Sequence, residues 1–232
     1  MGENLALNLE QKGYRVSLYN RLRENSPQAV DSFLANKGKN KHFIGTHSPK
    51  EFIESLKSPR KILLMIRAGH PVDEMITTLL PFLKKGDTII DGGNSDYRDT
   101  QRRENELREK RIFFVGCGIS GGEEGALHGP SIMPGGSDEI KKEILPVLQN
   151  IAAHLDDGTP CCSWIGPDGS GHFVKTVHNG IEYGDMQLIA EAYSLLNVLQ
   201  KGDHEATAQT FESWNKGVLD SYLIAVSYTH LR

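Results

Sequence analysis

Four polar side chains of different chemistry lie at helical spacing in the second half of the chain: Lys175, His178, Asn179 and Glu182. Steps of three, four and seven residues place them within an arc of about 100° on a helix that begins near Ser170, a residue type suited to an N-cap. An amine, an imidazole, an amide and a carboxylate on one face can move protons and hold the hydroxyl groups of a small substrate. The alternative interpretation is a solvated helix face with one Lys–Glu pair.

The remainder of this helix favours the functional interpretation. Its apolar residues, which we expect to face a core, are Val177, Ile181, Leu188 and Leu195. Glycine costs a helix interior about 1 kcal/mol relative to alanine, so glycines there usually admit another backbone or a ligand. The glycines in or beside the helix are Gly171, Gly180 and Gly184. The segment also lacks the mixture of lysine and glutamate that covers most exposed helix faces.

The segment Lys175–Gln187, with the sequence KTVHNGIEYGDMQ, resembles the signature of the 6-phosphogluconate dehydrogenase family, the decarboxylating enzymes of the pentose phosphate pathway. The match is long and specific, and its only departure is Thr176, where the family more often has methionine. The resemblance extends over nearly the whole chain up to about Ile224. It implies NADP as cofactor, 6-phosphogluconate as substrate, a homodimer and a cytoplasmic location.

Composition sets limits on other functions. The chain has 232 residues and a net charge of −4, which gives no reason to expect nucleic acid or an anionic membrane as a partner. No apolar run approaches the ~20 residues that span a bilayer, and no signal segment opens the chain. Cys117, Cys161 and Cys162 have neither disulfide-framework nor metal-ligand spacing. We therefore expect reduced thiols, no bound metal and a cytoplasmic protein.

The chain opens with a helix over residues 1–12, which Gly13 ends, and a strand over 15–20. A dinucleotide-binding unit starts instead with a strand, a glycine-rich turn and then a helix. In the resembled family the turn ends in Met-Gly, as Met1 and Gly2 do here. We therefore predict an α/β fold with a Rossmann-like doubly wound sheet that lacks its first strand.

Residues 1–167 form this NADP-binding domain in our interpretation. Further strands are expected at residues 61–66, 88–91, 112–116, 131–136 and 161–166. The continuous apolar run 61–66 is typical of a strand buried on both faces. Proline-containing or serine-capped helix starts are expected at Ser26-Pro27, at Ser48-Pro49 with Glu51, and at Ser137. The charge-rich stretch 102–110 is interpreted as a solvated helix face and nothing more.

Residues 168–224 are expected to begin an all-helical domain. Its helices are predicted over 170–200 and 206–223, the second with the apolar anchors Phe211, Trp214 and Leu219. Residues 225–232 depart from the resembled family and are interpreted as an atypical tail that is foreign or poorly ordered.

The strand over 15–20 ends at Asn20 and Arg21, where such folds bind the adenosine ribose. A carboxylate there binds the free 2′-hydroxyl of NAD, whereas a cation without a carboxylate suits the 2′-phosphate of NADP. The alternative is a surface arginine. In the family a threonine follows, so Leu22 removes one hydroxyl contact. The resemblance assigns further cofactor contacts to Met1, Gly2, Ile66, Arg67, Ala68 and Asn94.

The substrate site is expected at two glycine-rich loops and the Lys175 helix. Asn94 can donate and accept hydrogen bonds, and Ser120 with Gly121 and Gly122 offers a hydroxyl and unhindered N–H groups. The resemblance implies that these residues bind the sugar acid together with His178, Asn179 and Tyr183. It also implies that Lys175 is the general base on the C3 hydroxyl, with a pKa lowered from about 10.4, and that Glu182 protonates C1 after decarboxylation.

Two alternatives stay open from the residues alone. One is another β-hydroxyacid dehydrogenase, a family that shares the glycine-rich loop and the lysine but not the segment 181–187. The other is a non-catalytic nucleotide-binding fragment. The family's long C-terminal helical domain, which supplies further phosphate ligands and most of the dimer interface, is not in this sequence. We therefore expect the chain by itself to turn over weakly or not at all.

Overall fold

The computed structural model describes residues 1–21 and 29–231. The chain divides into two compact units, Met1–Thr176 and Val177–Arg232. Helix α8 (Ser170–Leu199) begins in the first unit and continues into the second. Among the described residues no helix is both long and apolar enough to cross a membrane.

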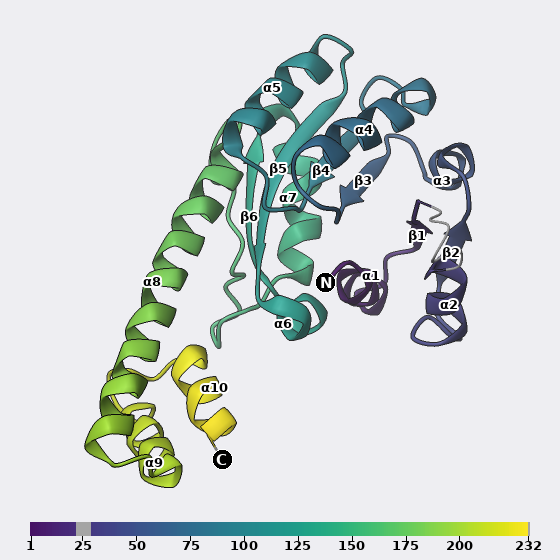
Figure 1. The fold of residues 1–232 in the computed structure, drawn as a ribbon. Helices are drawn as coiled ribbons and strands as arrows, with labels where there is room; N and C mark the ends of the chain where they lie inside the picture. Colours follow the sequence, from purple (N-terminus) through teal and green to yellow (C-terminus); the bar gives the residue numbers. More distant parts are fainter. Residues whose placement is uncertain (22–28, 232) are drawn as a thin grey trace. The chain divides into compact units, whose positions relative to one another are not determined.

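The first unit contains two sheets, drawn in Figure 1. The smaller sheet pairs β1 (Val16–Tyr19) in parallel with β2 (Phe43–Thr46). The larger sheet consists, in spatial order, of β3 (Lys61–Leu64), β4 (Thr88–Asp91), β5 (Phe113–Ser120) and β6 (Ser131–Gly136). Strands β3, β4 and β5 are parallel, and β6 is antiparallel to β5. We predicted one sheet that lacks its first strand. In the structure the strands form two sheets, one of two strands and one of four.

Helices cover both faces of the larger sheet, which confirms the doubly wound α/β prediction. One hydrophobic core joins β3, β4 and Phe114 of β5 to α3 (Pro49–Ser55), α4 (His70–Leu79) and α5 (Tyr97–Arg108). The other core joins Ile90 of β4, β5 and β6 to α1 (Gly2–Gln11), α6 (Gly122–His128) and α7 (Asp138–Ile151). The remaining helical segments of this unit are α2 (Ala29–Ala35) and η1 (Leu80–Phe82).

Local sequence rules account for several of these boundaries. Helix α1 ends before Gly13, whose φ of +88° is the left-handed conformation that glycine adopts at low cost. The Ser48 hydroxyl accepts a hydrogen bond from the Glu51 N–H and caps α3, as predicted. Ser137 caps α7 through the N–H of Glu139. The predicted helix start at Ser26-Pro27 lies outside the described residues.

Three strand predictions need correction. Strand β5 continues to Ser120, because Val115–Ser120 pairs with Ser131–Gly136 of β6. Residues 161–166 form only an isolated bridge between Cys162 and Ile132, with two further backbone hydrogen bonds that join Ile165 and Gly166 to β6. In β3 the alternate residues Ile62 and Leu64 are buried while Lys61 is exposed, so its two faces are not equally covered.

The second unit consists of the rest of α8 with α9 (His204–Trp214) and α10 (Tyr222–Leu231). The helix predicted over 206–223 ends at Trp214, and Leu219 is exposed in the connection to α10. Phe211 is buried and makes an edge-to-face contact with Trp214. Residues 225–231 belong to α10, so the expectation of a poorly ordered tail is wrong for them; an apolar run with Ile224 buried stabilises the helix.

The predicted apolar face of α8 is not buried by any described part of the chain. Val177, Ile181, Leu188 and Leu195 are between 47% and 66% exposed. Helical periodicity gave the direction of this face correctly but cannot say whether a partner surface is present. The burial prediction for these residues is therefore wrong in this structure.

Candidate active site

The carboxyl ends of the strands in the first unit carry the residues predicted to bind ligands. A methyl group added at Gly2 would lie 3.2 Å from Cβ of Met65, and one added at Gly93 would lie 3.1 Å from the carbonyl oxygen of Ile66. The N–H of Gly92 donates to the carbonyl oxygen of Leu64 at 2.9 Å. The start of α1, the loop 65–69 after β3 and the loop 92–96 after β4 therefore lie side by side, as parallel strands require.

Arg21 follows β1 directly and is paired with a carboxylate from α4. Both of its terminal nitrogens, Nη1 and Nη2, lie 3.1 Å from Oε2 of Glu74. Nδ1 of His70 lies 3.3 Å from the other oxygen of the same carboxylate. The Arg21 and Glu74 side chains are 57% and 38% exposed, so a phosphate group can reach the guanidinium. Asn20 is also exposed; Leu22, predicted to contact the cofactor, lies outside the described residues.

The loop 92–96 is held by the side chain of Asp91 at the end of β4. Oδ1 of Asp91 accepts a hydrogen bond from the Gly93 N–H at 3.0 Å, and Oδ2 accepts one from the Ser95 hydroxyl at 2.7 Å. Asp91 and Ser95 are buried, whereas Asn94, which lies between the two residues that Asp91 holds, is exposed. The loop thus presents the amide of Asn94 outward from a fixed backbone. Arg67 in the neighbouring loop is exposed and Ala68 is half-buried.

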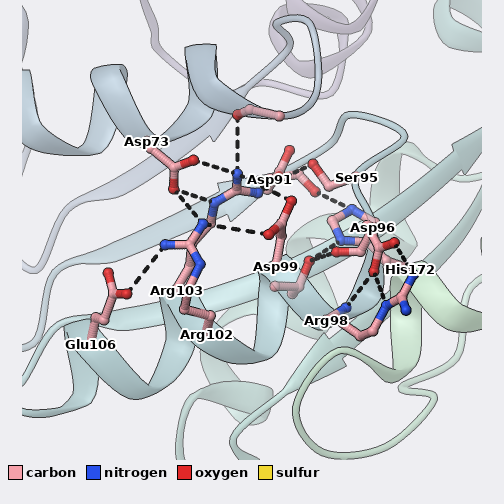
Figure 2. A network of polar contacts seen from close by, with 12 residues as sticks. Asp73, Asp91, Ser95, Asp96, Arg98, Asp99, Arg102, Arg103, Glu106 and His172 are labelled. Atoms are coloured by element: carbon pink, nitrogen blue, oxygen red, sulfur yellow. Dashed lines mark hydrogen bonds and ion pairs between the residues drawn. The ribbon is translucent and has the colours of Figure 1, made fainter.

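Arg103 on α5 lies behind both loops and is 1% exposed (Figure 2). Nε and Nη2 donate to the two carboxylate oxygens of Asp73 at 2.8 and 2.9 Å, and Nη2 also donates to the carbonyl oxygen of Gly69 at 3.0 Å. Nη1 lies 3.7 Å from Oδ2 of Asp91. The hydrogen bonds from Arg103 lower the pKa of Asp73 to about 2.

The stretch 102–110 is therefore not only a solvated face, and that prediction is wrong at two positions. Arg103 and Glu104 are buried, while Arg102 and Arg108 remain partly exposed. Burial raises the pKa of Glu104, whose Oε1 accepts a hydrogen bond from Arg108 at 3.2 Å. The buried charged residues of such a stretch cannot be identified from its sequence, because only tertiary packing decides which side chains turn inward.

His172 is buried between α5 and the end of β4. Its Nε2 donates to the carbonyl oxygen of Asp91 at 3.1 Å, and its Nδ1 is hydrogen-bonded to the Thr100 hydroxyl at 2.7 Å. A carbonyl can only accept, so Nε2 carries a proton, and in the neutral ring Nδ1 is then an acceptor. Burial lowers the pKa of His172 and favours the same form. His172 is thus a buried, hydrogen-bonded part of the packing between α8, α5 and β4.

Lys175 lies one helical turn after His172 and is 6% exposed. A methyl group added at Gly118 of β5 would lie 2.5 Å from Cβ of Lys175, and one added at Gly171 would collide with the carbonyl oxygens of Gly116 and Met133. The glycines let α8 begin directly on the sheet, as predicted for Gly171. At Gly180 and Gly184 no described atom lies within 4 Å of an added methyl, so close approach is not seen there.

Ser120 ends β5, and Gly121 and Gly122 open α6. Gly121 and Gly122 have φ values of +135° and +63°, which a side chain would strain. Asn4 and Asn8 of α1 donate hydrogen bonds to the carbonyl oxygens of Glu123 and Ala126 in α6. These bonds fix α6 against α1. Ser170 begins α8 as its first residue and not as a capping residue; its buried hydroxyl finds no hydrogen-bond partner among the described residues.

The other predicted site residues on α8 belong to the second unit. Nδ1 of His178 lies 3.2 Å from Oδ1 of Asn179 and 3.7 Å from Oε2 of Glu182. Tyr183 is 70% exposed. The helix that the residue pattern predicted is present and contains all of these residues. In the described part of the chain, no three His, Cys, Asp or Glu side chains converge as a metal site.

Two family models together match almost the whole chain. One is described as the NAD binding domain of 6-phosphogluconate dehydrogenase and matches residues 1–166. The other is described as the C-terminal domain of 6-phosphogluconate dehydrogenase and matches residues 171–232.

Individual relatives point to the same family as the two models. The chain is 54% identical over 227 residues to the NADP(+)-dependent, decarboxylating 6-phosphogluconate dehydrogenase of Bacillus subtilis, covering 98% of this chain and 47% of that protein. It is 51% identical over 232 residues to the decarboxylating enzyme of Ovis aries, covering 100% of this chain and 47% of that protein. The chain therefore spans about half the length of the curated relatives it matches.

The structure also resembles solved structures. The 6-phosphogluconate dehydrogenase of Plasmodium falciparum, described in apo form and in complexes with NADP+ and 6-phosphogluconate, matches with a TM-score of 0.90 and 42% identity, covering 100% of this chain and 49% of that chain. A 3-hydroxyisobutyrate dehydrogenase from Salmonella typhimurium matches with a TM-score of 0.76 at 18% identity, covering 99% of this chain and 74% of that chain. At that identity the second match shows a common fold and nothing more.

Proposed function

The chain belongs to the 6-phosphogluconate dehydrogenase family, and on that premise we propose that it binds NADP and 6-phospho-D-gluconate for oxidative decarboxylation to ribulose 5-phosphate. The observation that carries the proposal is the buried Lys175, whose side chain packs directly on Gly118 of β5. Because the chain belongs to this family, we prefer this function to that of the related β-hydroxyacid dehydrogenases. With those enzymes the chain shares a fold at low identity.

The residues in place fit NADP as the cofactor. Arg21 offers a partly exposed guanidinium at the end of β1, which suits a 2′-phosphate. The family resemblance adds Met1, Gly2, Ile66, Arg67, Ala68 and Asn94 from the neighbouring loops, together with Asn20 and Leu22. When bound, the nicotinamide ring of NADP accepts a hydride from C3 of the substrate.

The chain's own groups would move the protons. Lys175 accepts the proton of the C3 hydroxyl, a role that needs the neutral amine, from a side chain that is 6% exposed. Loss of CO2 from the resulting β-keto acid leaves an enediol, with the ketone as electron sink. Glu182 then donates a proton to C1. Substrate contacts are proposed for Asn94, Ser120, Gly121, Gly122, His178, Asn179 and Tyr183.

The assembly and location are proposed from the same family. We infer a homodimer, which the exposed apolar side chains of Ile181, Leu188 and Leu195 on α8 support because such surfaces mark protein contacts. We place the protein in the cytoplasm. Because the resemblance places most of the dimer interface in the C-terminal helical domain that this sequence does not contain, light scattering on a chain extended by that domain tests the dimer; a strict monomer at micromolar concentration would contradict it.

Calorimetric titration of the chain with NADP and with NAD tests cofactor binding. We expect Arg21→Gln to weaken NADP binding at least tenfold and NAD binding less than twofold, because only NADP carries the 2′-phosphate. Arg15→Gln, which removes the same charge at an exposed position directly before β1, is the matched control. Equal loss of both dinucleotides, or loss in the Arg15 variant, would contradict the assignment of Arg21.

Catalysis is tested by NADPH formation that depends on added 6-phosphogluconate. Lys175→Met is expected to abolish whatever turnover the chain has while NADP still binds. Turnover that survives this change would remove Lys175 from the mechanism. We expect slow turnover from this chain in isolation; rates near those of an ordinary dehydrogenase, about 10 s⁻¹, would contradict that expectation.

A further inference from the structure

The loops that follow β3 and β4 share one buried cation. The carbonyl oxygen of Gly69, at the end of the loop 65–69, accepts a hydrogen bond from Arg103. Asp91, whose carboxylate holds Gly93 and Ser95 of the loop 92–96, faces the other end of the same guanidinium. The two loops themselves make no side-chain hydrogen bond to each other among the described residues. Arg103 is thus the polar group that both loops have in common.

The same cluster also reaches the start of α8. The main-chain oxygen of Asp91 accepts a hydrogen bond from Nε2 of His172. The other ring nitrogen, Nδ1, is hydrogen-bonded to the hydroxyl of Thr100 on α5. Arg103 and Thr100 project from the same helix α5, and Lys175 follows His172 by one turn. Figure 2 shows Arg103, Asp91, Ser95 and His172 as one connected set.

A guanidinium is suited to this position because it presents donors in several directions within one plane. Three hydrogen bonds of 2.8–3.0 Å fix its Asp73 and Gly69 side. The Asp91 side is an ion pair at 3.7 Å, in which Nη1 donates no hydrogen bond to a described residue. The cation is 1% exposed, so little solvent screening weakens its interactions.

We propose that Arg103 is a positioning residue that couples the loop 65–69 to the loop 92–96, so that a displacement of either loop displaces the other and the base of the Lys175 helix. This inference rests on the proposed function for its catalytic meaning, because the two loops carry Arg67, Ala68 and Asn94. It goes beyond that function in assigning a role to residues that contact neither ligand.

The chain contains a matched control at the opposite ends of the same strands. Arg60 precedes β3 and donates to Asp87 before β4 at 3.0 Å and to the carbonyl oxygen of Ile53 at 2.9 Å. This pair is also buried, with side-chain exposures of 11% and 0%. Arg60→Lys therefore perturbs a buried Arg–Asp pair of similar kind far along the strands from the loops.

The decisive experiment compares Arg103→Lys with Arg60→Lys by hydrogen exchange, thermal unfolding and NADP calorimetry. Both variants are expected to lower the unfolding midpoint. Only Arg103→Lys is expected to speed amide exchange in residues 65–70 and 92–96 together, and to weaken NADP binding at least tenfold below the Arg60 variant. Faster exchange in only one loop, or equal loss of affinity in both variants, would overturn the proposal.

A second variant keeps the test open if Arg103→Lys does not fold. Asp73→Asn retains the volume of the side chain and removes the charge that pairs with Arg103 and with the more exposed Arg102, while Gly69 and Asp91 still face Arg103. We expect faster exchange in residues 92–96, to which Asp73 makes no hydrogen bond or ion pair among the described residues. A change confined to residues 65–70 would refute the coupling. If the wild-type chain fails to bind NADP, the proposed function fails, whereas exchange in the two loops still decides the role of Arg103.

Discussion

The two ends of β3 and β4 each hold a buried arginine, but the two arginines are connected differently. At the amino end, Asp87 accepts hydrogen bonds from the side chain and N–H of Arg60 and from the N–H of Lys84, all within the turns that precede the strands. At the carboxyl end, Arg103 contacts two aspartates whose partners extend to two loops and a helix. The first pair holds two turns and one carbonyl of α3, whereas the second is connected to two loops and the start of α8.

This difference shows why burial alone does not identify a functional residue. Breaking a buried ion pair destabilises a protein wherever the pair lies, because an uncompensated charge remains. What separates the two ends is which backbone each pair holds: turns at the amino end, ligand-facing loops at the carboxyl end. The predictions below test that distinction, from the largest expected effect to the smallest.

Asp87→Ala should cost the most stability, about 3–5 kcal/mol, because it leaves the Arg60 cation buried and unpaired. Urea unfolding followed by circular dichroism measures the loss. NADP affinity, measured at low temperature where the variant is folded, is expected to stay within twofold of wild type. A loss below about 1 kcal/mol, or a tenfold loss of affinity, would mean that the two ends do not differ as described.

Thr100→Val is expected to cost about 1–3 kcal/mol, because it leaves Nδ1 of buried His172 without its hydrogen bond while conserving volume. Thr77→Val on exposed α4, which also loses a hydroxyl hydrogen bond within its helix, is the control and should change stability by less than about 0.5 kcal/mol. Similar urea midpoints for both variants would show that the His172 contact contributes little.

Asp73 provides a pH-dependent test of the carboxyl-end cluster. Its pKa falls from 3.8 to about 2 in the folded protein, so its ion pair stabilises the fold above about pH 4 and is lost as the pH falls toward about 2. Discounted for its partial exposure, this contribution is at most about 2 kcal/mol. The difference in unfolding free energy between wild type and Asp73→Asn should therefore shrink steadily below pH ~4. A constant difference would exclude this linkage.

Glu74→Gln should have the smallest effect on stability, within about 0.5 kcal/mol, since its pair with Arg21 is largely exposed. The carboxylate competes with a phosphate for both terminal nitrogens of Arg21. We therefore expect NADP to bind about two- to fivefold more tightly and NAD to be unaffected. Glu54→Gln on α3 is the exposed control. Weaker NADP binding would mean that Glu74 orients Arg21 for the cofactor.

The sequence by itself determined the family, the alternation of strands and helices, and the polar residues of the Lys175 helix. These follow from local rules: Gly13 ends a helix, Ser48 and Ser137 cap helices, and the β-branched segment 88–91 forms a strand. Such signals lie within a few residues of each other and need no distant partner.

Tertiary structure alone decided which charges turn inward. Arg103 meets Asp73 and His172 meets Asp91 across 30 and 81 residues of sequence, and nothing local distinguishes Arg103 from Arg102 beside it. The same holds for Arg21, whose partner Glu74 lies 53 residues away. A buried charge is stable only where its partners converge in space, and that convergence depends on the packing of α4, α5 and α8 against the sheet.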